Sequence, residues 1–206
     1  FILPFSHDEV VHMKGSLVNK MPGDYFQQMA NWRCLLTLWM THPGKKLLFM
    51  GQEFASFSEW GFEKELDWNL FEYPAHQKAN RFFKDLALVY KNHDALYQYD
   101  HQKKGFEWII VDDRNQSVFA FIRRSDVETL VVVLNMTPNV HETYEVGVPF
   151  AGTYQEIINS DKEVYFGSDQ YNGKPLKSFK GKHQQFEYYI KPKIGPLSGM
   201  IFRYKK

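Results

Sequence analysis

Two adjacent ionisable residues, His7 and Asp8, lie one serine beyond an apolar stretch, Phe1 to Phe5. An apolar strand that ends in ionisable side chains is how a parallel α/β sheet or barrel presents catalytic groups at the carboxyl ends of its strands. There the Asp8 carboxylate could stabilise positive charge in a transition state, and His7 could hydrogen-bond a hydroxyl-rich substrate. The alternative is a helix-capping aspartate beside a structural histidine, because so short a motif also arises by chance.

A second polar cluster, Gly51-Gln52-Glu53, follows the apolar run Leu47 to Met50. The carboxyl ends of neighbouring parallel strands lie at one edge of a sheet, so the two clusters are predicted to line one cleft. Glu53 is a candidate substrate-binding residue. A supporting role, as the partner of a lysine or arginine, is favoured over direct catalysis.

The segment from Gly51 to Pro74 is too long for a simple connection and is rich in aromatic residues and carboxylates. Exposed aromatic faces beside carboxylates suit carbohydrate, since rings stack on sugar C–H faces and carboxylates accept hydrogen bonds from hydroxyls. Most of these rings are expected to form a small core within the loop. Trp60, next to Glu59, is the best candidate for a ring that binds substrate.

The elements that would position these groups follow an α/β pattern in the first half of the chain. Asp24 can cap a helix that ends before Thr41-His42-Pro43-Gly44. The continuous apolar run Leu47 to Met50 is typical of a strand covered on both faces. Strand, helix and strand in this order predict one right-handed βαβ crossover. A second, amphipathic helix is predicted over Ala75 to Asn92.

From about Gly105 the pattern changes to short β-rich runs separated by turn formers. Such runs are typical of an antiparallel sandwich. The expected strands are Phe106 to Val111, Val118 to Arg123, Thr129 to Leu134, Thr143 to Val148, Thr153 to Ile158, Phe186 to Ile190 and Met200 to Tyr204. The predicted fold class is α/β plus all-β, with one domain over residues 1–104 and another over 105–206.

Composition excludes several classes of protein. The net charge is +1 with no basic stripe, which argues against nucleic acid as a partner. No apolar run is long enough to span a bilayer. The single cysteine, Cys34, lies on an apolar helix stripe, so a buried, inert thiol in a reducing, cytoplasmic setting is expected. The spacing of His7, Glu9 and His12 does not match a zinc-binding helix, so no metal site is expected. The sequence contains no glycine-rich phosphate-binding motif, so no cofactor is expected either.

Several motifs, in order along nearly the whole chain, resemble bacterial 1,4-α-glucan (glycogen) branching enzymes of the α-amylase superfamily. In the first half they are Leu3-Pro4-Phe5-Ser6-His7-Asp8-Glu9-Val10-Val11-His12, Asn19-Lys20-Met21-Pro22-Gly23-Asp24, His42-Pro43-Gly44-Lys45-Lys46-Leu47-Leu48-Phe49-Met50-Gly51, Ser58-Glu59-Trp60 and Leu66-Asp67-Trp68. In the second half they are Gly105-Phe106-Glu107-Trp108, Phe121-Ile122-Arg123-Arg124, Asn135-Met136-Thr137-Pro138 and Glu156-Ile157-Ile158-Asn159-Ser160-Asp161.

The resemblance implies that the first half supplies the last two strands and helices of a (β/α)8 barrel and that the second half is the family's C-terminal β-sandwich. It implies that Asp8 is the third catalytic carboxylate and His7 its substrate-binding neighbour. The nucleophile and general acid of this retaining mechanism would lie on earlier strands. The parent enzyme would cleave an α-1,4 bond and transfer the chain to a 6-hydroxyl of α-glucan. Met13 departs from the family pattern, which commonly has glycine there.

Two other functions stay open. The first is an amylolytic hydrolase of the same superfamily, which would share the His-Asp pair. The second is a non-catalytic module for glucan binding or assembly. On the principal interpretation the chain by itself is expected to be inactive, and exposed barrel edges are expected to promote self-association.

Overall fold

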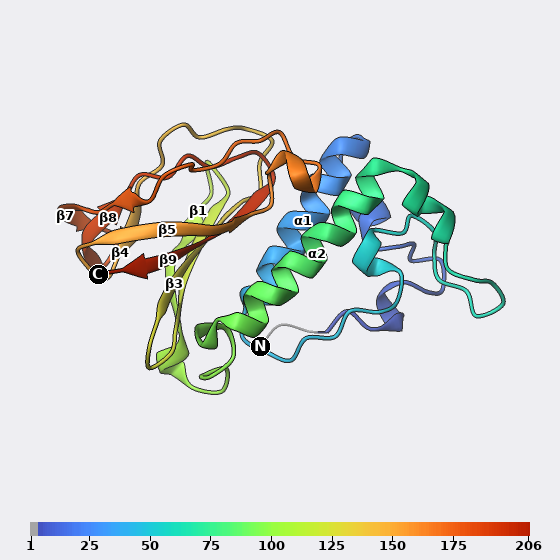
Figure 1. The fold of residues 1–206 in the computed structure, drawn as a ribbon, viewed down its shortest axis with the longest axis horizontal. Coiled ribbons are helices and arrows are strands. Elements are labelled where there is room, and N and C mark those ends of the chain that lie inside the picture. The colour runs from blue at the N-terminus through green and yellow to red at the C-terminus, as the bar shows by residue number, and fades with distance from the viewer. Residues whose placement is uncertain (1–3) are drawn as a thin grey trace.

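The structure is a computed structural model that describes residues 4–206. Its two long helices are α1 (Tyr25–Thr41) and α2 (Pro74–Asn92). The strands are β1 (Phe106–Asp113), β2 (Val118–Arg124), β3 (Thr129–Asn135), β4 (Val146–Val148), β5 (Thr153–Asn159), β6 (Leu176–Lys177), β7 (Phe179–His183), β8 (Phe186–Ile190) and β9 (Ser198–Lys205). Figure 1 shows the helices side by side, with the strands on one side of them and the loops of the first 70 residues on the other.

The first helix begins where its cap predicts. The Asp24 carboxylate accepts a hydrogen bond from the Gln27 backbone N–H at 2.9 Å, and the Gln27 side chain accepts one from the Asp24 N–H at 3.1 Å. This reciprocal capping box satisfies two N–H groups that the first turn leaves unpaired. The second helix starts at Pro74, whose missing N–H costs nothing at the first helical position. The structure thus confirms both predicted helices.

The expected strand over Leu47 to Met50 is wrong. Among residues 4–100, the only β-pairing is an isolated parallel bridge between Phe5 and Leu48. It is held by hydrogen bonds from Phe5 N to Leu47 O, 2.8 Å, and from Phe49 N to Phe5 O, 2.9 Å. An apolar run becomes an extended strand only when neighbours pair along it, and here pairing is limited to this bridge. The predicted strand over Phe1 to Phe5 lies largely outside the described residues.

The second half is an antiparallel sandwich, as predicted. The larger sheet has the strand order β1-β2-β3-β9-β5-β6, and the smaller has the order β4-β8-β7. Val146, Val148 and Ile190 of the small sheet share a buried cluster with Val131 and Val133 of the large one. Two strands were not predicted, β6 and β7, and β4 is shorter than the expected Thr143 to Val148.

The other face of the large sheet is covered by α1. Strand β3 is therefore buried along its whole length, with Val131 and Val133 toward the small sheet and Leu130, Val132 and Leu134 toward the helices. Contact is close at Gly199 of β9, where a Cβ atom would lie only 2.5 Å from the Cβ of Thr37. The helices and the sandwich consequently share one hydrophobic core.

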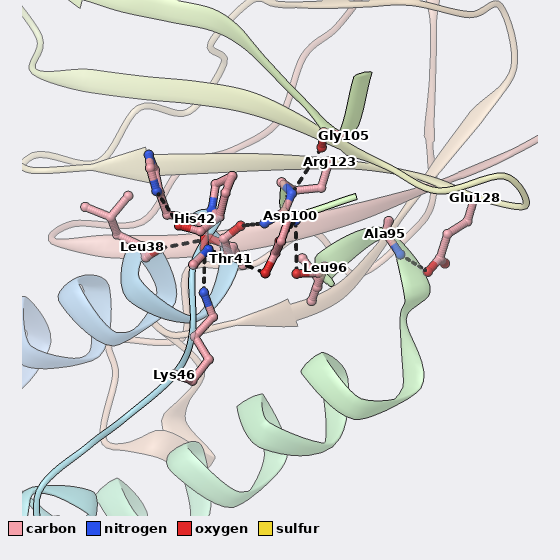
Figure 2. Close-up of polar contacts among 12 residues, drawn as sticks. Leu38, Thr41, His42, Lys46, Ala95, Leu96, Asp100, Gly105, Arg123 and Glu128 are labelled. Carbon is pink, nitrogen blue, oxygen red and sulfur yellow. Dashed lines mark hydrogen bonds and ion pairs between the residues drawn. The ribbon is translucent and has the colours of Figure 1, made fainter. Parts of the chain in front are cut away.

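A buried arginine joins the end of α1 to the sheet and to the connection that follows α2. Arg123 of β2 donates to the backbone carbonyls of Thr41, Leu96 and Gly105 and to the Asp100 carboxylate (Figure 2). The Thr41 carbonyl is one of the last in α1 and has no partner within the helix. Arg123 thereby ties the first half of the chain to the second.

Candidate functional site

The bridge between Phe5 and Leu48 places the two predicted polar clusters at one edge. Each residue is followed within a few positions by a short 3-10 helix, His7–Glu9 after Phe5 and Gln52–Phe54 after Leu48. The bridge is parallel, so the chain leaves both residues in the same direction. This is the juxtaposition expected from the order of the two apolar runs.

His7 and Asp8 contact each other and face solvent. His7 Nε2 lies 3.2 Å from Asp8 Oδ1, and the two side chains are 57% and 66% exposed. Ser6 is the residue that caps this short helix, since its Oγ accepts a hydrogen bond from the Asp8 N–H at 3.3 Å. The Asp8 carboxylate is therefore not used as a cap; it accepts a hydrogen bond from Ser6 Oγ at 3.3 Å and stays largely exposed to solvent.

Glu53 is partly buried, and its backbone carbonyl accepts a hydrogen bond from Asn80 Nδ2 at 3.5 Å. Within residues 4–206, its carboxylate has neither a lysine nor an arginine as partner. Its neighbour Gln52 instead links this cluster to the segment before α1. This buried side chain accepts a hydrogen bond from the Leu17 N–H at 3.0 Å.

Trp60 is half-buried and packs edge-on against Phe49, with ring centroids 5.2 Å apart and an angle of 83° between the planes. Phe49 in turn lies 6.1 Å from the His7 ring. The backbone N–H of Trp60 donates a hydrogen bond to the backbone carbonyl of Val10 at 3.0 Å. Trp60 thus lies near the His7-Asp8 segment, with part of its ring surface accessible.

The small core that was predicted for the remaining aromatic residues of the loop forms in part, around Phe54. Phe54 is fully buried and contacts Trp68 and Phe71, with centroid separations of 5.5 and 5.0 Å. The most exposed rings of this segment are Phe62, Trp68 and Tyr73. No sequence signal separates these three rings from Trp60, because exposure in a long loop depends on how the loop folds back.

Glu59 was not predicted as a site residue, and it makes the most specific contacts near Asp8. Its carboxylate accepts hydrogen bonds from the backbone N–H groups of Met13, at 3.0 Å, and Gly15, at 2.8 Å. These donors, that of Gly15 foremost, lower the pKa of Glu59. The turn-forming residues around Gly15 were the only sequence signal for this contact. They predict a turn but do not indicate which side chain binds to it.

Three other features of the described residues concern metal ligation, the cysteine thiol and membrane-spanning helices. Among residues 4–206, no group of three His, Cys, Asp or Glu side chains is arranged to hold a metal ion. Cys34 is buried, and burial raises the pKa of its thiol to about 12, which confirms an inert cysteine. In the same part of the chain, none of the helices combines the length and apolar character needed to cross a membrane.

Comparisons with known proteins show what the chain is similar to. Residues 108–205 match the family model for the alpha amylase, C-terminal all-beta domain. The chain is 50% identical over 205 residues to the 1,4-alpha-glucan branching enzyme GlgB of Bacillus subtilis (strain 168). The chain is a relative of the 1,4-alpha-glucan branching enzymes. The match covers 98% of the chain and 33% of the B. subtilis enzyme.

A second branching enzyme, from Bacillus caldolyticus, is 47% identical, with 98% of the chain and 31% of that enzyme covered. The chain therefore spans about a third of the length of the branching enzymes it matches. Among solved structures, the Nostoc punctiforme debranching enzyme aligns with a TM-score of 0.62 at 16% identity, covering 93% of this chain and 34% of that one. An AmyP variant in complex with maltotriose aligns with the same TM-score at 12% identity, covering 87% and 35%. These two likenesses show the fold alone.

Proposed function

We propose that this chain is the part of a glycogen branching enzyme that carries the third catalytic carboxylate, Asp8. The supporting observation is the solvent-exposed His7-Asp8 pair beside the parallel Phe5–Leu48 bridge, in a chain similar over 98% of its length to a branching enzyme. The whole enzyme cleaves an α-1,4 bond of α-glucan and transfers the released chain to a 6-hydroxyl. The proposal divides the chain into a barrel part, residues 1–104, and a C-terminal sandwich, residues 105–206. It also places the enzyme in the cytoplasm.

Each proposed residue has a distinct role. The Asp8 carboxylate holds sugar hydroxyls and stabilises the positive charge that develops on the sugar in an oxocarbenium-like transition state. His7, whose Nε2 lies 3.2 Å from Asp8, donates to a neighbouring hydroxyl. Glu53 offers an unpaired carboxylate to further hydroxyls, and Trp60 offers the accessible part of its ring to a sugar face. The nucleophile and general acid come from the part of the enzyme that this chain does not include.

A chimera tests this function. The chain replaces the matching third of the B. subtilis branching enzyme, and formation of α-1,6 linkages from amylose is measured. We expect branching by the chimera and a loss of at least ~10²-fold in kcat on Asp8→Ala, with a small change in KM, because the lost interaction strengthens as charge develops. Glu9→Ala, a change at an exposed neighbour in the same short helix, is the matched control.

The outcomes separate this proposal from its rivals. Release of reducing ends without α-1,6 linkages would identify a hydrolase. Activity of the Asp8→Ala chimera within a few-fold of the unmodified one would refute the role of Asp8. The 206-residue chain alone is expected neither to hydrolyse nor to branch amylose. If it bound glucan strongly while the chimera stayed inactive, a non-catalytic binding module would be the better account.

A further inference from the structure

The turn after His12 has an unusual backbone. His12, Met13 and Gly15 all have positive φ values, +60°, +64° and +70°. Backbone N–H groups in such a conformation point into a common concavity, and concavities of this kind bind anions. Two of them, those of Met13 and Gly15, point to the Glu59 carboxylate, one to each oxygen. Glu59 is therefore the anion that occupies this turn, and it comes from a loop more than 40 residues later.

The turn leads back to Asp8. Lys14 lies between the two N–H donors, and its Nζ donates to the Asp8 backbone carbonyl at 2.7 Å. The residue after Glu59 makes a further link, because the Trp60 N–H donates to Val10 O. Residues 59 and 60 thus hold the segment that follows Asp8 at three backbone N–H or C=O groups. The main chain of Asp8 is restrained from its carboxyl-terminal side.

The charge of Glu59 is what the turn binds. A carboxylate can accept from both N–H groups at once, whereas a glutamine at this position offers one acceptor oxygen. If both oxygens were lost, as in Glu59→Ala, the N–H groups of Met13 and Gly15 would donate to water instead. The turn would then have no anion bound to it. A residue with a positive φ is costly unless its surroundings hold it, so the His12–Gly15 turn is expected to relax when Glu59 is removed.

We propose that Glu59 is a positioning residue for Asp8: its carboxylate fixes the His12–Gly15 turn, and Lys14 in that turn fixes the Asp8 main chain. This inference rests on the proposed branching function. Glu59 does not touch the reacting atoms in this arrangement. Its effect on turnover arises because a misplacement of about 1 Å in a catalytic group can cost up to about 10²-fold in rate.

The test measures kcat and KM of the chimera for Glu59→Ala, Glu59→Gln and the control Glu63→Gln, an exposed carboxylate of the same loop. We expect Glu59→Ala to lower kcat at least 10-fold with KM within about 3-fold, because positioning of Asp8 acts on the transition state. The kcat of Glu59→Gln should lie between that of Glu59→Ala and that of the unmodified chimera. The kcat and KM of Glu63→Gln should equal those of the unmodified chimera. Rates are compared per folded enzyme, with Tm measured for each variant, so that a purely structural effect is removed.

A second measurement uses the 206-residue chain itself. Amide hydrogen exchange at Met13 and Gly15 should accelerate at least 10-fold in Glu59→Ala and stay unchanged in Glu63→Gln. Unchanged exchange in Glu59→Ala would overturn the proposal. So would an active chimera that tolerates Glu59→Ala, and in that case the branching function would stand. A chimera that makes no branches before any substitution would overturn the branching function and the positioning role together.

Discussion

Arg123 and Asp100 form an ion pair in the interior of the protein, with Arg123 Nη2 2.5 Å from Asp100 Oδ1 and the two side chains 0% and 8% exposed (Figure 2). The same guanidinium donates from Nε to Gly105 O at 3.2 Å, from Nη2 to Leu96 O at 3.0 Å and from Nη1 to Thr41 O. One side chain therefore satisfies acceptors from the end of α1, from the connection after α2 and from the start of the sandwich.

Replacement of Arg123 should be strongly destabilising. Arg123→Met removes the guanidinium donor from three carbonyls and from the Asp100 carboxylate, which is left with the Gly44 N–H at 3.4 Å, and we expect the free energy of unfolding to fall by about 3–5 kcal/mol. The neighbouring Arg124 pairs with Glu107 at 2.5 Å near the surface, so Arg124→Met should cost no more than about 1 kcal/mol. Urea unfolding of both variants measures the difference. Equal losses would contradict the central role of Arg123.

Met13 offers a stabilising substitution. Its φ is +64° and its side chain is 97% exposed, so the side chain adds strain without burying apolar surface. Met13→Gly should raise the free energy of unfolding by about 1 kcal/mol or somewhat less, because glycine relieves the strain but gains entropy in the unfolded chain. Met13→Ala keeps the Cβ atom and is the control. A gain with alanine as large as that with glycine would show that backbone strain is not the cause.

Lys46 should make stability depend on pH in the alkaline range. Burial is the main cause that lowers its pKa to about 8; nearby Asp100 raises it in part and Arg123 lowers it further. The unfolded chain, with a lysine pKa near 10.5, binds more protons between these two values. The contribution of Lys46 to stability therefore rises with pH from about 8 to 10.5.

Urea unfolding at several pH values in this range checks the sign. Lys46→Met should remove the rise relative to the unmodified chain, whereas a change at the exposed Lys45 should leave it intact. Tyrosines that lie away from Lys46 contribute alike to all three proteins and cancel in the comparison. A rise that persists unchanged in Lys46→Met would contradict the assignment.

The chain on its own is expected to self-associate through the face around the Phe5–Leu48 bridge. Leu47 and Met50 are each about half exposed, and with Phe83 they line an open groove of about 530 Å³. Exposed apolar surface of this kind favours contact with a second copy. Sedimentation should show association that rises with concentration and is weakened by Met50→Lys, but not by Val127→Lys in a hairpin turn of the sandwich. A strictly monomeric chain would disprove this expectation.

Much of the secondary structure could be predicted because its causes are local. The Asp24 cap, the amphipathic pattern of α2 and the continuous apolar run Val118 to Ile122 of β2 lie within a few residues of the structure they specify. Strands β6 and β7 escaped prediction because Leu176–Lys177 and Phe179–His183 are mostly polar or exposed. They are strands only because β5 and β8 lie alongside to pair with them.

The pairing of His7 with Asp8 was determined by the sequence itself, since adjacent residues in a short helix need no distant partner to meet. The order of apolar runs likewise determined that Phe5 and Leu48 meet in parallel. What holds this segment was decided by tertiary structure alone. The Glu59 carboxylate meets the N–H groups of Met13 and Gly15 across 46 and 44 residues. The Arg123 guanidinium donates a hydrogen bond to the Thr41 carbonyl, 82 residues earlier in the sequence. Sequence patterns record periodicity and neighbours, whereas such contacts depend on how distant segments pack together, as at Gly199, whose missing side chain lets Thr37 approach.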